Sequence, residues 1–422
     1  MKSDSGYRIL MFAPAFAPFA NPESIVNSKL ALAFLDAGWE IDVISRNLTI
    51  ESRYNYGSEW IDPWLPLKEI NHTVNYPSDN KVSRIFQILY GVLRTGYLIE
   101  GCRWASYALD IALTLHRKKK FDVVISRSGP DSAHLAAMAF IRKTGIPWIA
   151  NWNDPTGGKA PEPYGRGLAG ETGWIYECFL QKVIKKVDWI TFPSDRLKNY
   201  VSMYLGEDIL RKSSVIPHVA MSPPLITKKA NNTFTLCHAG YLSKERNPKI
   251  FLEALATFIR QRGLNDRLRF NLIGIENCDF RNVIQEYGLQ DNIIFKGRLS
   301  YQDTLSEIYR SDVAVVLEAS SEESIFLPSK FIDYVQVGRP ILAVSPKMGT
   351  LNDIISSHGG GTVVDCESVA NITQGLHELY DAWRDRTIDS IYGSNRLFPL
   401  YSPSKIVCQY AILFDKLRMK YV

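Results

Sequence analysis

Residues 312–345 read DVAVVLEASSEESIFLPSKFIDYVQVGRPILAVS. An unbroken apolar run is followed by a polar loop, a stretch with helical spacing that Gly338 closes, and a second apolar run. Continuous apolar strands joined through a helix are typical of parallel sheets that are buried on both faces. The stretch therefore predicts a strand–helix–strand unit, with the loop LPSK at the start of its helix.

The same alternation runs through most of the chain and predicts an α/β protein with two doubly wound domains. The expected strands are 7–14, 39–46, 121–127, 146–152, 187–193 and 213–218, and then 234–240, 268–274, 291–297, 312–318, 339–345 and 361–365. A polar, Pro-containing junction at 221–232 separates the two series. A chain of 422 residues suits two domains of about 200 residues each. We predict domains at 1–222 and 223–395.

Bulk composition limits the classes of function. Six scattered cysteines without a Cys-x-x-Cys pair favour small core residues in a reducing compartment. No apolar stretch reaches the roughly 20 residues that cross a bilayer, and the first residues suggest a buried strand rather than a secretory peptide. The net charge of +5 permits an anionic partner, but basic residues are dispersed and no nucleic-acid reader motif occurs. We expect a cytoplasmic protein that does not bind nucleic acid.

Residues 81–120 are helical in pattern and mix aromatic with basic side chains. Two interpretations stay open. The segment forms one or two ordinary covering helices of the first domain, or it is a peripheral surface that rests on anionic lipid at the inner face of the membrane. In the second case Arg84, Arg94, Arg103 and the run 117–120 lie on its polar side.

The loop LPSK places Lys330 at a helix start and Asp333 one turn later. Backbone N–H groups at a helix N-terminus bind phosphate oxygens, and Lys330 adds a positive charge there. A carboxylate at the position of Asp333 accepts hydrogen bonds from vicinal hydroxyls such as those of a ribose. The arrangement fits a nucleotide diphosphate, and it equally fits an exposed i,i+3 ion pair.

A second stretch favours the nucleotide. HAGYLSKERNPKIFLEAL (238–255) puts a glycine-containing loop after the first strand of the second domain. Arg246 precedes a helix start at Asn247 and Pro248. Arginine suits bidentate phosphate contacts, and the alternative is an arginine on a surface loop.

With these motifs, the chain resembles GT-B glycosyltransferases of the large retaining group often called family 4. The resemblance is carried by 126–155, 187–195, 238–248, 295–318 and 327–342, in that order. It implies two Rossmann-like domains that face an interdomain cleft, and a last segment, 396–422, that crosses back to the first domain as a helix.

The resemblance also implies a donor site for a nucleotide sugar in the second domain. Arg246 falls where the family has a basic residue on the donor phosphates, and Asp333 falls where it has a carboxylate on the donor ribose. Lys330 and Ser329 line the loop between them. The remaining implied donor-binding residues are Gly240, Gly297 and Arg298.

Two loops of the first domain carry candidate catalytic side chains. His134 follows the strand at 121–127, and Asn153 and Asp154 follow the strand at 146–152. We expect them to position the acceptor and the sugar, with Asp154 as a proton acceptor. The simpler interpretations are a core or helix-capping histidine and a turn residue before Pro155.

The sequence contains no Asp-x-Asp motif, the carboxylate pair that holds a divalent ion in metal-dependent glycosyltransferases. We therefore expect no metal and no other cofactor, with positive side chains and helix N-termini carrying the leaving-group charge. The expected function is retaining transfer of a sugar to a glycan or lipid-linked acceptor in surface polysaccharide or glycolipid synthesis. Two alternatives stay open: a non-catalytic GT-B subunit of a glycan-building complex, suggested by Tyr241 in place of a second basic residue, and a GT-B sugar-nucleotide epimerase.

Overall fold

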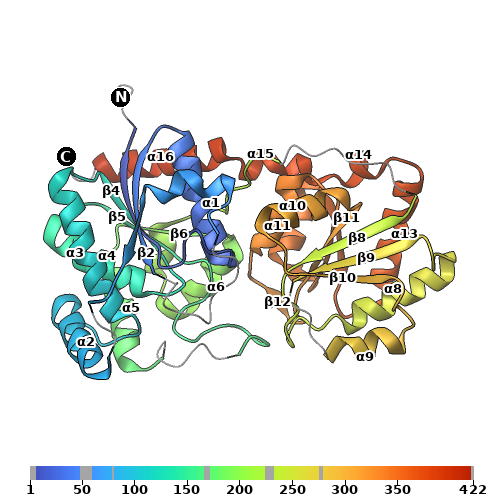
Figure 1. Ribbon diagram of the computed structural model, residues 1–422, viewed down its shortest axis with the longest axis horizontal. Helices are drawn as coiled ribbons and strands as arrows, with labels where there is room; N and C mark the ends of the chain where they lie inside the picture. Colours follow the sequence, from blue (N-terminus) through green and yellow to red (C-terminus); the bar gives the residue numbers. More distant parts are fainter. Residues whose placement is uncertain are drawn as a thin grey trace. The chain divides into compact units, whose positions relative to one another are not determined.

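The computed structural model describes residues 6–47, 59–77, 80–165, 172–223, 232–274 and 279–419. The chain divides into two compact units. The first unit comprises Met1–Pro161, Gly165–Val219 and Pro403–Val422, and the second comprises Glu162–Tyr164 and Ala220–Ser402. Each unit has a parallel sheet with helices against it (Figure 1).

In its described residues the first unit has a seven-stranded sheet in the order β3-β2-β1-β4-β5-β6-β7. The strand order reverses between β1 and β4, and in open parallel sheets ligands bind beyond the carboxyl ends at such a point. The strands are β1 (Arg8–Phe12), β2 (Glu40–Arg46), β3 (Asn71–Val74), β4 (Val123–Arg127), β5 (Trp148–Asn151), β6 (Trp189–Phe192) and β7 (Ser213–Val215). The helices are α1 (Pro22–Asp36), α2 (Lys81–Thr95), α3 (Cys102–Lys118), α4 (Ser132–Thr144), α5 (Trp174–Lys186), α6 (Asp195–Leu205), α7 (Asp208–Arg211) and α16 (Pro403–Met419).

The described residues of the second unit form a six-stranded sheet in the order β10-β9-β8-β11-β13-β15, and its order reverses between β8 and β11. Its strands are β8 (Phe234–Ala239), β9 (Leu268–Ile273), β10 (Ile293–Gly297), β11 (Val313–Leu317), β13 (Ile341–Ser345) and β15 (Gly361–Asp365), with a separate short pair, β12 (Glu323–Ser324) and β14 (Met348–Gly349). Its helices are α8 (Lys249–Arg262), α9 (Asp279–Glu286), α10 (Tyr301–Arg310), α11 (Ser329–Val337), α12 (Thr350–His358), α13 (Val369–Arg384), α14 (Ile388–Tyr392) and α15 (Phe398–Tyr401). Figure 1 shows α8, α9 and α13 on one side of this sheet and α10 and α11 on the other.

The predicted α/β class is confirmed, because both sheets are parallel and doubly wound. A strand lies within each of the ranges predicted from apolar runs. β3 was not predicted because its residues, Asn-His-Thr-Val, form no apolar run. Among the described strands it lies at the sheet edge and pairs with β2. β12 and β14 have two residues each, too few for a pattern to show.

Helix α16 belongs to the first unit because of its aromatic contacts. The Phe414 ring packs 5.0 Å from the Tyr7 ring and 5.5 Å from the Trp39 ring, and Tyr410 packs 5.2 Å from Phe34. Burial of each large apolar side chain contributes about 2–3 kcal/mol, so this cluster holds the helix against α1. In the described part of the chain no helix is long and apolar enough to cross a membrane.

Candidate functional site

Three glycines lie at the carboxyl ends of β8, β9 and β10. Gly240, Gly274 and Gly297 have φ angles of +127°, +135° and +67°, a region that L side chains rarely adopt. The Gly274 amide donates to the Gly297 carbonyl at 2.8 Å, and a Cβ on Gly274 would lie only 2.7 Å from the Gly240 carbonyl oxygen. The backbone atoms of these three glycines, which carry no side chains, therefore lie next to one another at this edge of the sheet. We call Gly240, Gly274 and Gly297 the glycine row. Arg298 directly follows Gly297 and is exposed.

Lys330, at the start of α11, lies over the first of these glycines. A Cβ on Gly240 would be 2.7 Å from the Lys330 ammonium nitrogen. The same nitrogen is 3.3 Å from Nε2 of His238, a fully buried residue of β8. His238 Nδ1 is 2.9 Å from the Val315 carbonyl oxygen. Because a carbonyl oxygen only accepts, Nδ1 carries the proton and Nε2 accepts from Lys330.

The surroundings of Lys330 lower its affinity for a proton, chiefly through burial. Burial, and then the positive charge of Arg246, lower the pKa of Lys330 to about 7, although Glu318 and Asp333 act in the opposite direction. Burial and the nearby Lys330 also hold the pKa of His238 well below its ordinary value, so this imidazole stays neutral. A diphosphate placed here would restore the full charge of the lysine.

Arg246 is held from its other side by an aromatic ring. Its Nε donates to the Tyr164 hydroxyl at 3.3 Å, and its guanidinium lies 5.6 Å from the centre of the Tyr164 ring. Tyr164 belongs to the second unit and packs edge-on against Phe326. Ring and hydroxyl thus orient a half-buried guanidinium toward the charges of the LPSK loop.

Glu318 is an acid of this site that the sequence did not single out. It directly follows β11 and is 8% exposed, and its carboxylate accepts from Ser324 Oγ at 2.8 Å and Ser345 Oγ at 2.5 Å. Burial raises the pKa of Glu318, while the two serines and the charges of Arg246 and Lys330 act against this shift. Two further acids follow it closely in the sequence, and of these Glu322 is exposed and Glu323 is half-buried. The signal in the sequence that could have identified Glu318 was an acid directly after a predicted buried strand.

Asp333 lies on α11 one turn after Lys330, and its Oδ1 accepts from the Tyr301 hydroxyl at 2.7 Å. Tyr301 begins α10, just after the loop that contains Gly297, and its burial raises its pKa well above the ordinary value. Ser329 is the first residue of α11, and the preceding Pro328 has no side chain that caps the helix. No side chain of the N-cap residue therefore competes with an anion for the first N–H groups of α11.

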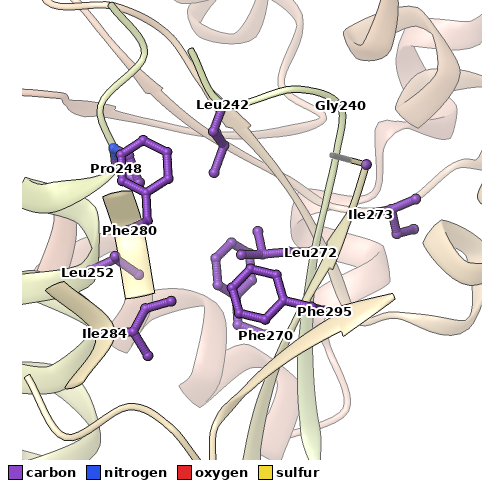
Figure 2. Close-up of a pocket in the computed structure, with 11 residues that line it drawn as sticks. Gly240, Leu242, Pro248, Leu252, Phe270, Leu272, Ile273, Phe280, Ile284 and Phe295 are labelled. Atoms are coloured by element: carbon purple, nitrogen blue, oxygen red, sulfur yellow. The ribbon is translucent and has the colours of Figure 1, made fainter. Parts of the chain in front are cut away.

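Beside Gly240 the structure contains a small apolar cavity of about 20 Å³ (Figure 2). Side chains from the β8–α8 loop, β9, β10, α8 and α9 line it, among them Leu242, Leu252, Phe270, Phe280 and Phe295. This volume is enough for about one water molecule. The cavity is therefore a gap in the core beneath the glycine loop and not a nucleotide pocket.

Gly240→Ala is expected to weaken nucleotide binding and to destabilise the protein by about 1–2 kcal/mol. The new methyl group would meet the Lys330 ammonium, and alanine is strained at φ +127°. Gly263→Ala is the matched control, because Gly263 has φ +63° with nothing within 4 Å. Thermal melts with and without a nucleoside diphosphate separate the two effects. Equal loss of this stabilisation in both variants would contradict the contact between Gly240 and Lys330.

In the first unit, polar side chains gather at the carboxyl ends of β1, β4 and β5. Asn153 Nδ2 donates to Glu23 Oε1 at 2.7 Å, and Arg127 Nε donates to Asn27 Oδ1 at 2.6 Å. Burial raises the pKa of Glu23 to about 7 against the opposing effects of Arg127 and Asn153. Asp154 is exposed, and its charge contributes to this rise. The group combines a carboxyl that titrates near neutrality with amide donors, which suits hydroxyl binding and proton transfer.

His134 lies in the core rather than at this surface. It is 0% exposed, its Nδ1 is 2.7 Å from Ser126 Oγ, and its ring packs 4.8 Å from that of Trp152. Burial lowers the pKa of His134 to about 4, with Asp131 opposing the shift. These contacts favour the interpretation as a core histidine, which supports the loop that carries Asn153.

Asp131 accepts the hydrogen bonds that hold the loop with Asn153 in place. It is 6% exposed, and it accepts hydrogen bonds from Trp152 Nε1 at 3.0 Å, from the Thr156 hydroxyl and from the Tyr176 hydroxyl. These donors come from the segment after β5 and from α5, so one carboxylate after β4 fixes the position of the Asn153–Asp154 loop.

The sequence prediction missed Glu23, Gly274, His238, Tyr301 and Glu318. An acid in the first turn of a helix, such as Glu23, ordinarily complements the helix dipole, and an apolar strand that contains one histidine ordinarily buries it. Apart from Glu318, whose place directly after a strand is a local signal, these residues become notable only through a neighbour that is distant in the sequence.

Residues 226–392 match the protein family described as Glycosyl transferases group 1. The matched range lies within the second unit. The match confirms the prediction that the chain is a glycosyltransferase. The residues of the glycine row, with Arg246, Glu318, Lys330 and Asp333, all lie within the matched range. Among curated proteins, no sequence matches the chain significantly.

Solved structures match the glycosyltransferase over almost its whole length. Sucrose-phosphate synthase from Thermosynechococcus elongatus has a TM-score of 0.67 and 13% identity, over 98% of this chain and 100% of that chain. HepE of Anabaena in complex with UDP and glucose has a TM-score of 0.64 and 11% identity, over 97% and 100%. A glycosyltransferase from Rickettsia africae has a TM-score of 0.64 and 14% identity, over 98% of each chain. These likenesses confirm the predicted GT-B fold.

Within the described residues, no three His, Cys, Asp or Glu side chains group closely enough to hold a metal ion. The absence of a metal requirement stays a prediction, as do the roles of the individual site residues.

Proposed function

We propose that the protein is a retaining glycosyltransferase that works without a metal ion and uses a nucleotide diphosphate sugar as donor. The acceptor is a glycan or a lipid-linked glycan in surface polysaccharide or glycolipid synthesis. The observation that carries the proposal is the cradle around Lys330: a lysine with a pKa of about 7, over Gly240 and beside Arg246, at an uncapped helix start. A cationic site of this kind suits a diphosphate.

In this proposal the residues of the second unit have separate tasks. Arg246, Lys330 and the first N–H groups of α11 bind the diphosphate, and Asp333, oriented by Tyr301, binds the ribose hydroxyls. Ser329 lines the same loop, and Gly297 and Arg298 meet the base. HepE of Anabaena contains UDP, which makes UDP the first nucleotide to test.

The proposed reaction breaks the bond between the anomeric carbon and the diphosphate oxygen, and forms a bond from that carbon to the acceptor oxygen. The leaving diphosphate takes the acceptor proton, so no enzyme nucleophile is required. The positive charges around Lys330 stabilise the charge that develops on the leaving group. In the first unit, Asn153, Asp154 and Glu23 position the acceptor hydroxyl.

A thermal-shift screen of UDP, GDP, ADP and CDP is expected to find one nucleotide that stabilises the protein. A ligand that binds only the native state raises the midpoint by mass action. We expect the shift to persist in EDTA, to disappear in Arg246→Ala and to remain in Arg310→Ala, a control on α10 whose arginine forms an i,i+3 ion pair with Glu307. Loss of the thermal shift in EDTA, with recovery in magnesium, would contradict metal independence. Absence of a shift with every nucleotide would favour the alternative that the protein is a non-catalytic subunit.

Product analysis separates the enzymatic alternatives. Free nucleotide that is released from the matching nucleotide sugar only when an acceptor is present identifies a transferase. An isomerised sugar nucleotide without an acceptor identifies an epimerase. The anomeric configuration of the product, read from NMR coupling constants, tests retention directly.

A further inference from the structure

Helix α2 buries its polar face and exposes its apolar face. Its buried residues are Gln87, Gly91 and Thr95, spaced four apart. The opposite face carries large apolar side chains at helical spacing, with exposed fractions from 39% at Tyr90 to 85% at Leu93. We call this surface the α2 face, and it consists of Val82, Ile85, Phe86, Leu89, Tyr90 and Leu93. A surface helix of a globular protein ordinarily has the reverse orientation.

Close backbone contact fixes this orientation. A Cβ on Gly91 would lie 2.7 Å from the Cys102 carbonyl oxygen at the start of α3. Thr95 Oγ1 donates to the Gly91 carbonyl at 2.7 Å, and Gln87 accepts from Arg103 at 3.4 Å. Rotation of α2 to bury its apolar side would bring bulky side chains to the place where only a glycine fits. The exposed α2 face is therefore built into the fold.

The apolar surface continues beyond the helix. Leu98 is 58% exposed, and Trp174 at the start of α5 is 77% exposed. The two segments adjoin, because the Tyr97 ring packs 5.5 Å from the ring of Phe179 on α5. Figure 1 shows α2 and α5 at the periphery of the first unit, and α2 rests on α3 and α4 rather than on the sheet. Contiguous exposed apolar surface of this kind marks a contact with a partner or a lipid surface.

Helix α2 itself carries a positive charge. From Lys81 to Ile99 the chain contains three basic residues and no acidic one. Arg84 is exposed on α2, and Arg94 pairs with Asp110 of α3. Asp110 borders a groove that is also lined by Arg117, Lys120 and Lys143. Large apolar side chains together with basic residues are typical of helices that lie in the interface of an anionic membrane.

We propose that the α2 face binds the surface of a bilayer that contains anionic lipid. The apolar side chains enter the boundary between headgroups and acyl chains, and the basic residues contact the headgroups. A 15-residue helix of about 22 Å lies in the plane of the interface and does not span it. Charge favours lipid over a second copy, because pairing two α2 helices would bring like charges together. This surface is independent of the donor site.

The test is flotation of the full-length protein with vesicles of phosphatidylcholine, alone or mixed with phosphatidylglycerol. Wild type is expected to float with the mixed vesicles and to dissociate at high salt. The double variant Phe86→Ser/Leu93→Ser is expected to lose about tenfold or more of this binding. The matched control is Ile412→Ser/Met419→Ser on α16, whose two side chains are 65% and 75% exposed and which should bind as wild type. Arg84→Gln is expected to weaken binding to the mixed vesicles and to leave the neutral ones unaffected.

Thermal melts of all variants, with UDP stabilisation as a second readout, show whether each remains folded. Equal flotation of wild type and of the α2 double variant would overturn the proposal, and so would absence of flotation. A wild-type dimer that the α2 variant converts to a monomer, without vesicle binding, would also overturn it and would assign the face to contact between copies.

Discussion

Lys330→Met is expected to weaken binding of a nucleoside diphosphate roughly 100-fold, because a charge-assisted contact at a buried site contributes about 1.5–3 kcal/mol. Methionine has nearly the same length but carries neither the charge nor the donor that faces His238 Nε2. Calorimetric titration of UDP, or of the nucleotide that the screen identifies, measures the change. Lys347→Met is the control, because the Lys347 side chain is 81% exposed and its ion pair with Asp365 contributes little.

The pH dependence of binding tests the same residue without relying on the size of the loss. In the free protein the pKa of Lys330 is about 7, and a bound diphosphate raises it. The affinity of wild type should therefore fall as pH rises above 7, where the nucleotide phosphate, with a pKa of about 6, is already ionised. In Lys330→Met this fall should be absent. A fall of equal slope in both proteins would show that another group binds the proton.

Asp131→Ala is expected to destabilise the first unit by about 3–5 kcal/mol, since it leaves the buried donors of Trp152, Thr156 and Tyr176 without their acceptor. For a unit of this size the loss corresponds to a fall in Tm of roughly 6–20 °C. Differential scanning calorimetry follows the two units as separate or overlapping transitions.

Asp208→Ala is the matched control for this variant, because the Asp208 side chain is 74% exposed and its ion pair with Arg211 is superficial. Its Tm should stay within a degree or two of wild type. A shift of similar size in both variants, or a shift confined to the second unit's transition, would contradict the role given to the Asp131 network. Retained UDP binding in folded Asp131→Ala would show that the donor site does not require it.

Part of the candidate site could be predicted from local pattern. Gly240 and Arg246 lie in the loop after an apolar strand, and Lys330 lies at a helix start, so chemistry of that kind is visible within a few residues. Parallel strands then bring such loops to one edge of the sheet. The prediction of residues at 238–248 and 327–333 therefore needed no knowledge of distant contacts.

Other parts of the site depend on contacts between distant residues. Tyr301 orients Asp333 across 32 positions, and His238 meets Lys330 across 92. Glu23 meets Asn153 across 130 positions. Local spacing carries no information on such pairs, so these groups remained an ordinary tyrosine, histidine and helix-start acid in the sequence.

The sequence by itself determined the two doubly wound sheets, the places of their apolar strands and the loops that follow these strands, because apolar periodicity and turn residues act over short distances. Only the tertiary structure decided which side chains share a site and which face of α2 is buried. That helix is amphipathic in any context, but the space beside the start of α3 admits only Gly91, and this contact turns the apolar side outward. Shape complementarity between distant segments, rather than local preference, fixes such choices.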